Sequence, residues 1–292
     1  MNKWFESIEG LSRDFRRVGY LADEATATSA FLAGRLGKPL LVEGPAGTGK
    51  TEMARAVAEA TNRRLVRLQC YEGLDESKVL YEWNYRKQLL WLQGGLANQA
   101  AASEDGAGDW EDIFSEVFLL ERPVLQAIRS AEPVVLLIDE VDRIEMETEA
   151  LLLEVLADFS VTIPEMGTLS AATRPFTVLT SNATRELSEA LKRRCLYLWL
   201  DYPTLERERA IVMSRVPDIE EKLAGEIVRV VRSLRGLDLK KAPSIAETLD
   251  WAHSLVELGL DKVDAESVSL TLGSLLKHPS DMDKARSERL GD

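Results

Sequence analysis

The stretch from Gly44 to Thr51 matches the glycine-rich phosphate-loop pattern G-x-x-x-x-G-K-[ST] at every fixed position. Its glycines allow backbone conformations that a side chain would block, so successive N–H groups can turn inward around phosphate oxygens. Lys50 would reach the β- and γ-phosphates, and the Thr51 hydroxyl would ligand Mg²⁺. The residues predicted to bind the phosphates of a nucleoside triphosphate are Gly44, Pro45, Ala46, Gly47, Thr48, Gly49, Lys50 and Thr51.

An acidic pair, Asp139-Glu140, follows five consecutive β-branched or leucine residues at 134–138. Asp139 is placed to hold Mg²⁺ through its hydration shell, and Glu140 to orient and deprotonate an attacking water. Alternatively, Asp139 is a helix N-cap and Glu140 a first-turn charge that favours the helix dipole. Because a phosphate loop precedes the pair in the same chain, we favour the catalytic interpretation.

Three further polar residues are candidates for the same reaction. Asn182 follows the buried strand predicted over 176–181, where its amide can bond a γ-phosphate oxygen or the attacking water; equally, it can cap a helix predicted over 184–191. Arg193 and Arg194 lie at the end of that helix. They either pair with helix-terminal carbonyls or reach the nucleotide of a neighbouring subunit.

The elements that must position these residues alternate between strands and helices. Apolar runs predict buried strands, as in a parallel sheet with helices on either side, an α/β doubly wound fold. Helix 23–36 is expected to present one apolar face, and Gly19-Tyr20-Leu21 before it either encloses the adenine or packs. The predicted strands are 38–43, 64–69, 134–138, 176–181 and 196–200, with a hairpin over 161–169; the other predicted helices are 52–60 and 143–159, and the apolar face of helix 23–36 comprises Ala25, Thr28, Phe31, Leu32 and Leu36.

The interval 71–133 is longer than one crossover connection needs, so it must contain an insertion. We predict a helix over 77–96 and a flexible loop over 100–108. The insertion is rich in aromatic residues, which either grip a partner or pack its own small core. These aromatic residues are Tyr71, Tyr81, Trp83, Tyr85 and Trp91.

Length and charge narrow the class of protein. The 292 residues suit two domains, which we place at 1–200 (α/β, nucleotide-binding) and 201–292 (helical). The second is predicted to contain helices 205–216, 219–234, 244–258 and 265–277, followed by a charged, loosely ordered tail over 280–292. The net charge of −13 argues against nucleic acid as the main partner. No apolar run is long enough for a membrane span and the start has no apolar signal region, so a cytoplasmic protein is expected. Cys70 and Cys195 are expected to be packing residues.

The order of these features along nearly the whole chain resembles the AAA+ ATPases, and within them the MoxR branch. The segments 67–75 and 81–85 are most similar to the CoxD-type accessory ATPases of carbon monoxide dehydrogenase maturation. The resemblance implies that Asn182 is the first sensor and Arg194 the arginine finger, with Arg193 able to substitute. It also implies a helical lid over 201–292. The second-sensor arginine of many MoxR relatives would fall near 242–246, where this chain has no arginine.

The same resemblance implies a function: a molecular chaperone that hydrolyses ATP with Mg²⁺ to remodel a client metalloenzyme. The client implied is carbon monoxide dehydrogenase with its molybdenum-copper site. The partners implied are further copies of the chain in a ring, expected to be a hexamer, and a protein with a von Willebrand factor A domain. Two alternatives remain open, namely a AAA+ motor acting on DNA and a nucleotide-dependent scaffold with little turnover.

Overall fold

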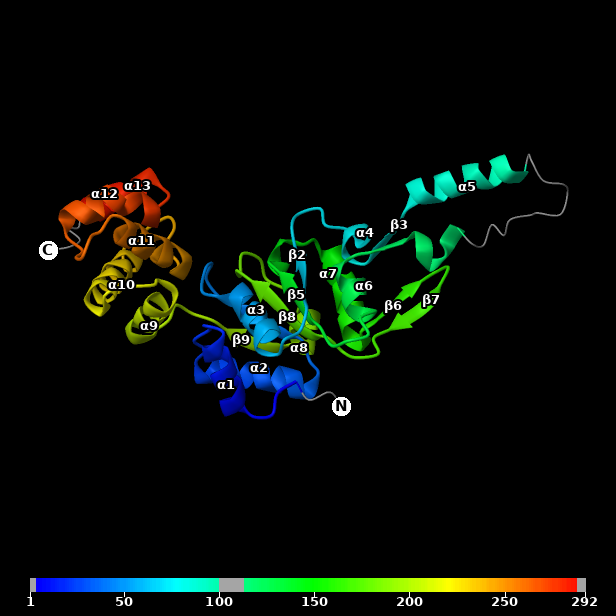
Figure 1. Cartoon of the computed structure of the whole chain (residues 1–292), viewed down its shortest axis with the longest axis horizontal. Helices are drawn as coiled ribbons and strands as arrows, with labels where there is room; N and C mark the ends of the chain where they lie inside the picture. The colour runs from blue at the N-terminus through cyan, green and yellow to red at the C-terminus, as the bar shows by residue number, and fades with distance from the viewer. Residues whose placement is uncertain (1–3, 100–112, 288–292) are drawn as a thin grey trace.

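The centre of the molecule is a five-stranded parallel sheet in the order β2-β5-β8-β1-β9 (Figure 1). A computed structural model describes residues 4–99 and 113–287. The five strands are β1 (Leu40–Glu43), β2 (Leu65–Gln69), β5 (Val135–Asp139), β8 (Phe176–Ser181) and β9 (Leu196–Trp199). Because all five run in one direction, the residues that follow β1, β5 and β8 meet at the same edge of the sheet. The doubly wound α/β fold expected from the sequence is therefore confirmed.

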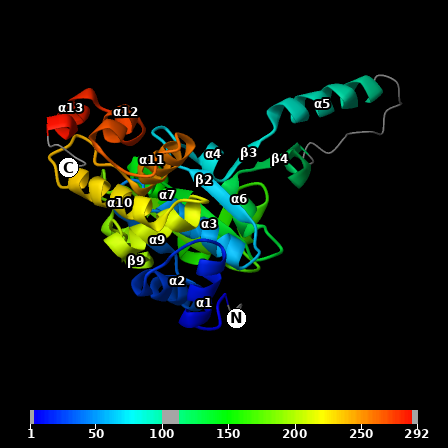
Figure 2. The same cartoon turned by 60° about the vertical axis from the view of Figure 1, so that its left-hand side comes forward.

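Helices cover both faces of this sheet, as Figures 1 and 2 show. The β1 side chains alternate between the faces: Leu40 and Val42 pack with the N-terminal helices, whereas Leu41 packs with the helices that precede and follow β5. The first layer comprises α1 (Ile8–Arg17), α2 (Glu24–Leu36) and α3 (Lys50–Ala60); the second comprises α6 (Pro123–Ile128), α7 (Met146–Asp158) and α8 (Glu189–Arg194). Cys70 and Cys195 are free thiols: Cys70 lies in the core on the second-layer side of the sheet and Cys195 packs against that core, so both are packing residues. Burial raises the pKa of both thiols to about 12.

Two of the predicted helices differ in detail from the structure. The apolar face proposed for α2 is wrong, because Leu32 and Leu36 are exposed. Small residues form the buried face instead, which allows the helix to lie close to Trp4 and Phe5 at Gly34. The buried residues are Thr26, Ala27, Ala30, Ala33 and Gly34. The helix predicted over 143–159 is divided into the short 3₁₀ turn η3 (Val141–Arg143) and α7.

The insertion contains a two-stranded antiparallel sheet, β3 (Tyr81–Trp83) with β4 (Leu119–Glu121). The single helix predicted over 77–96 is therefore wrong: α4 (Glu76–Val79) and α5 (Tyr85–Gln99) are separated by β3, and η2 (Glu116–Phe118) leads into β4. Trp83 is 7% exposed and packs edge-on against Phe114, whereas Trp91 on the projecting helix α5 is 42% exposed. The loop predicted over 100–108 lies outside the described residues.

After β9 the described chain is helical and has a hydrophobic core of its own, around Trp251 and Ile227. The helices are α9 (Leu205–Arg215), α10 (Glu221–Arg235), α11 (Ile245–Glu257), α12 (Ala265–Leu275) and α13 (Pro279–Ser287). The expectation of a loosely ordered tail is wrong as far as residue 287, because Asp281 is buried and accepts hydrogen bonds from the backbone N–H groups of Lys240 and Lys241.

The hairpin β6 (Ser160–Ile163) and β7 (Gly167–Ser170) forms as predicted. None of the helices described here is long and apolar enough to cross a membrane.

Candidate functional site

The phosphate loop connects β1 to α3, as the motif requires. Gly47 has a φ of 73°, and a Cβ atom there would overlap Ser244 at the start of α11, so the close approach of that helix needs a glycine. The Lys50 ammonium group donates hydrogen bonds to the carbonyl oxygens of Gly44 at 2.8 Å and Pro45 at 2.7 Å. Lys50 thus points back across its own loop, on the side where inward-turned N–H groups would hold phosphates.

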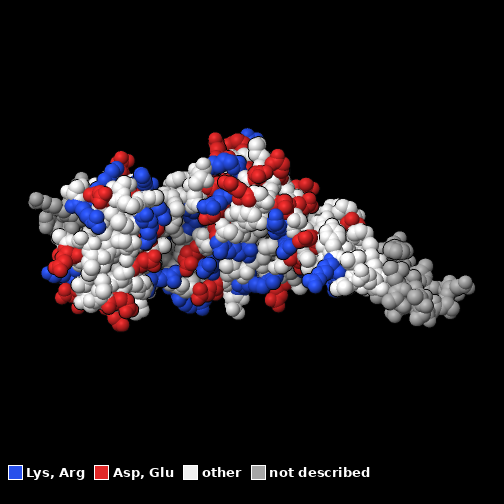
Figure 3. All heavy atoms as spheres, turned by 90° about the horizontal axis from the view of Figure 1, so that it is seen from above, with Lys and Arg blue, Asp and Glu red and all other residues white. Residues whose placement is uncertain are grey.

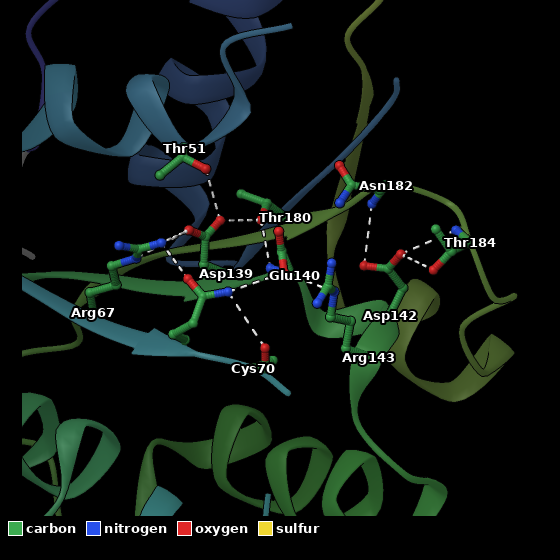
Figure 4. Close-up of polar contacts among 11 residues, drawn as sticks. Thr51, Arg67, Cys70, Asp139, Glu140, Asp142, Arg143, Thr180, Asn182 and Thr184 are labelled. Carbon is green, nitrogen blue, oxygen red and sulfur yellow. Dashed lines mark hydrogen bonds and ion pairs between the residues drawn. The ribbon is translucent and has the colours of Figure 1, made fainter. Parts of the chain in front are cut away.

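Asp139 is almost completely buried at the carboxyl end of β5, and both of its side-chain oxygens are partnered (Figure 4). Oδ1 accepts hydrogen bonds from the hydroxyls of Thr51 at 2.8 Å and Thr180 at 2.6 Å. Oδ2 accepts from Arg67 Nη2 at 2.6 Å and Nε at 3.1 Å. The side chain joins three neighbouring strands and helix α3. The N-cap alternative for Asp139 is wrong, because Glu140 occupies the N-cap position of the 3₁₀ turn that follows.

Glu140 follows in the left-handed region with a φ of 57°, an uncommon conformation for a non-glycine residue. Its backbone N–H donates to the Thr180 hydroxyl at 2.9 Å. Its side-chain Oε2 accepts from Gln69 Nε2 at 3.2 Å and pairs with Arg143 Nε at 2.8 Å. The turn therefore directs the second carboxylate to the same edge of the sheet as the phosphate loop.

Asn182 lies at the carboxyl end of β8, beside β1. Its backbone N–H donates to Asp142 Oδ1 at 3.2 Å, and among the described residues its side-chain amide has no hydrogen-bond partner. The alternative in which Asn182 caps a helix from 184 is wrong, because α8 begins at Glu189 and Ser188 is its N-cap. The amide is thus available to a ligand.

A cavity of about 760 Å³ brings these residues together. Its lining includes the phosphate loop, Asp139, Glu140, Thr180 and Asn182. Burial lowers the pKa of Lys50, although Asp142, Asp139 and Glu140 oppose that shift. The cavity has room for a nucleotide, since small-molecule sites are typically ~300–1,000 Å³.

Arg193 and Arg194 do not line this cavity. They end α8, immediately before β9, and thus lie at the opposite end of the parallel strands from the phosphate loop. Both side chains are exposed, and within residues 4–99 and 113–287 neither guanidinium makes a hydrogen bond or an ion pair. Pairing with the carbonyls at the end of α8 is therefore not observed.

The C-terminal helices close the other side of the cavity. The N–H of Ile245, at the start of α11, donates to the Gly47 carbonyl at 3.2 Å. Arg207 of α9 bonds the Leu21 carbonyl at 2.8 Å, and Arg215 pairs with Glu52 at 2.5 Å. The segment in which a second-sensor arginine would fall thus touches the phosphate loop through its backbone.

The oxygen donors at this site fit Mg²⁺. A hard cation of this size is usually bound by one or two carboxylates together with substrate phosphates and water. Thr51 and Asp139 supply a hydroxyl and a carboxylate whose oxygens are 2.8 Å apart, at the edge of the predicted phosphate cradle. Mg²⁺ held there would neutralise charge on the β- and γ-phosphates.

Several contact residues were not singled out from the sequence. Thr180, Arg67 and Gln69 hold the acidic pair, and Arg143 pairs with Glu140. The available signals were Thr180, one of three hydroxyl residues in β8, and Arg67 and Gln69 as polar residues at period two in β2. Neither pattern separates binding-site residues from the polar residues that many strands carry, because the sequence does not show that β2 lies next to β5.

Comparisons with known proteins assign the chain to a family. The chain is 24% identical over 244 residues to the uncharacterized protein SH1500 of Staphylococcus haemolyticus, which covers 81% of this chain and 82% of that protein. It is 25% identical over 243 residues to the uncharacterized protein SSP1341 of Staphylococcus saprophyticus, with the same coverage. A solved structure, a mutant of RuvB from Thermotoga maritima, is 20% identical, covers 92% of this chain and 70% of that chain, and has a TM-score of 0.49. The family model described as AAA domain (dynein-related subfamily) matches residues 39–195, more than half of the 292 residues, so the chain belongs to that family.

Proposed function

We propose that this protein is an ATP-hydrolysing AAA+ chaperone of the MoxR kind, which forms a ring and remodels a client metalloenzyme. AAA domains generally hydrolyse ATP, and the 2.8 Å hydrogen bond between Thr51 and Asp139 carries the proposal for this chain. It joins two predicted Mg²⁺ ligands from distant segments, with Glu140 next in sequence.

In the proposed reaction the phosphate loop and Lys50 bind the triphosphate. Glu140 accepts a proton from the attacking water, and Asn182 hydrogen-bonds that water or a γ-phosphate oxygen. Gln69 and Arg143 both contact Oε2 of Glu140, so Oε1 is the oxygen that would accept from the water. Arg194 of a neighbouring subunit, with Arg193 in reserve, stabilises charge on the transferred phosphoryl group.

The client, the partner protein and the compartment are proposed from the family resemblance. We propose maturation of the molybdenum-copper site of carbon monoxide dehydrogenase, a partner with a von Willebrand factor A domain, a hexameric ring and a cytoplasmic location. Residues 1–200 would form the nucleotide-binding domain and 201–292 the lid. The separate hydrophobic core of α9 to α13 supports that division.

One observation favours a second function, a scaffold that binds ATP with little turnover. No arginine occurs at 242–246, where Ile245 instead bonds the phosphate loop through its backbone. A DNA motor, by contrast, is disfavoured by the net charge of −13. On the face shown in Figure 3, basic and acidic side chains are interspersed.

A hydrolysis assay with and without DNA separates the three functions. The chaperone predicts measurable turnover that duplex and single-stranded DNA leave unchanged. A DNA motor predicts stimulation by DNA, and a scaffold predicts ATP binding by calorimetry without turnover. Lys50→Ala is the control, because it removes the charge facing the β- and γ-phosphates and should weaken ATP binding itself; undiminished affinity would contradict the phosphate-loop assignment.

A further inference from the structure

Asp142 connects the turn that carries Glu140 to the loop that carries Asn182 (Figure 4). It lies in η3, two residues after Glu140, and is 4% exposed. Its Oδ1 accepts from the N–H of Asn182 at 3.2 Å. Its Oδ2 accepts from the N–H of Thr184 at 3.1 Å and from the Thr184 hydroxyl at 2.6 Å. All three donors belong to the loop between β8 and α8.

That loop has a backbone that needs external support. Ala183, next to Asn182, has a φ of 55°, in the left-handed region that side chains disfavour. On the other side of the loop, Ser181 accepts from the Ala183 N–H at 2.9 Å and donates to the buried Glu43 carboxylate at 2.8 Å. The direction of the Asn182 amide is therefore set by bonds to the backbone on either side of it, because the amide itself has no described partner.

Asp142 is not among the residues that line the nucleotide cavity, whereas Asn182 and Glu140 are. Asp142 can therefore affect hydrolysis only through its bonds to the loop between β8 and α8. Burial raises the pKa of its carboxyl group, but the hydrogen bonds from Thr184 and Asn182 outweigh burial and hold the pKa below its ordinary value. The group is thus ionised near neutral pH and can accept all three bonds.

We propose that Asp142 is a positioning residue for Asn182: its carboxylate holds the β8–α8 loop so that the Asn182 amide and Glu140 face one nucleotide in fixed relation. The proposal rests on the proposed ATP hydrolysis for its catalytic consequence. Its structural part, the clamp on the loop, does not depend on hydrolysis.

The first test uses Asp142→Asn, which keeps the shape but turns an amide N–H₂ toward a donor. We expect kcat to fall about tenfold to a hundredfold, with ATP affinity changed by less than about threefold. The double variant with Asn182→Ala should hydrolyse ATP as slowly as Asn182→Ala alone, because the clamp acts through that residue. If the two losses multiply, the positioning role is overturned.

Glu149→Gln is the matched control. Glu149 is 3% exposed and, like Asp142, accepts hydrogen bonds from the loop between β8 and α8. The donors are the backbone N–H of Ser188 at 2.8 Å and the Arg185 guanidinium at 2.8 Å, both farther along the chain from Asn182 than Thr184 is. It should lower the melting temperature at least as much as Asp142→Asn yet leave kcat within about twofold. An equal loss of kcat in this control would show that general loop stability, not positioning, is responsible. Thr184→Ser should retain activity and Thr184→Val should lose part of it.

Hydrogen exchange tests the clamp without any turnover. In Asp142→Asn the amides of Asn182 and Thr184 should exchange faster than in the parent, while those of β1 stay unchanged. Unchanged exchange at Asn182 and Thr184 overturns the inference whatever the hydrolysis rate. Absence of turnover in the parent protein would instead contradict the proposed function, and faster exchange would still support the clamp.

Discussion

The two ends of the parallel sheet differ in how completely their polar side chains are partnered. At the carboxyl end, Asp139 has four hydrogen bonds from three residues, and Glu140 has two partners for its side chain. At the amino end, Arg193 and Arg194 are exposed and make no bond to a described residue. One chain thus assembles the acidic half of the site, whereas the two arginine side chains contact no acceptor among the described residues. This contrast is the reason for the proposal that a second copy of the chain supplies Arg194.

We expect the largest effect from a substitution at the amino end of the sheet. Arg194→Ala is expected to bind ATP normally but to hydrolyse it ~10³–10⁵-fold more slowly, as when arginine fingers are removed. Steady-state hydrolysis and calorimetry measure the two quantities. Mixing Arg194→Ala with Glu140→Gln subunits should restore activity, because some interfaces then combine both intact residues. Co-assembly without recovery would mean that Arg194 does not act on a neighbour.

Glu140→Gln alone tests the partnered end. Removing the base should slow hydrolysis by ~10²–10⁴-fold and leave ATP affinity nearly intact. Glutamine keeps the size of the side chain and can still bond Gln69, so the turn should survive, which the melting temperature checks. Parent-like turnover in this variant would remove Glu140 from the mechanism.

Two tryptophans of the insertion differ in exposure: Trp83 is buried against Phe114, whereas Trp91 is exposed and has an edge-on contact with Phe118. Trp83→Ala should lower the free energy of unfolding by about 3–5 kcal/mol, because it opens a cavity beside Phe114. Trp91→Ala should cost about 1 kcal/mol or less and leave basal hydrolysis unchanged, since that side chain is 42% exposed. Urea titration of both variants measures the difference. Equal losses would assign Trp91 to packing rather than to a partner surface.

The smallest effect concerns two buried hydroxyls that have no hydrogen-bond partner among the described residues, those of Tyr20 and Thr26. Tyr20 is 8% exposed and lines the nucleotide cavity, whereas Thr26 is not among its lining residues. If the Tyr20 hydroxyl bonds the nucleotide, Tyr20→Phe should weaken ATP binding about threefold to tenfold. Thr26→Val should leave binding unchanged and is the control in the same calorimetric titration. Parent-like affinity in Tyr20→Phe would support the packing interpretation of residues 19–21.

Sequence patterns predicted the strands of the sheet well, because a strand buried in a parallel sheet is a short run of mostly apolar residues, and such a run is visible in the local sequence. The predictions were wrong where contacts with distant residues decide the local structure. The single helix expected over 77–96 is interrupted at β3, whose residues pair with β4, almost forty positions later in the chain. The apolar face predicted for α2 was wrong because Gly34 and the alanines of this helix allow close packing. A pattern of hydrophobic residues does not show that small residues will form the buried face.

The sequence by itself determined the phosphate loop and the acidic pair, since both are local patterns whose chemistry follows from residue type and spacing. Only the tertiary structure decided which groups restrain them. Thr180, Arg67 and Gln69 reach Asp139 and Glu140 because β5 lies between β2 and β8 in the sheet. Asp142 reaches Asn182 for the same reason, and no spacing along the chain encodes that contact. Strand order brings residues far apart in sequence within hydrogen-bond distance, and it is settled by packing of the whole sheet.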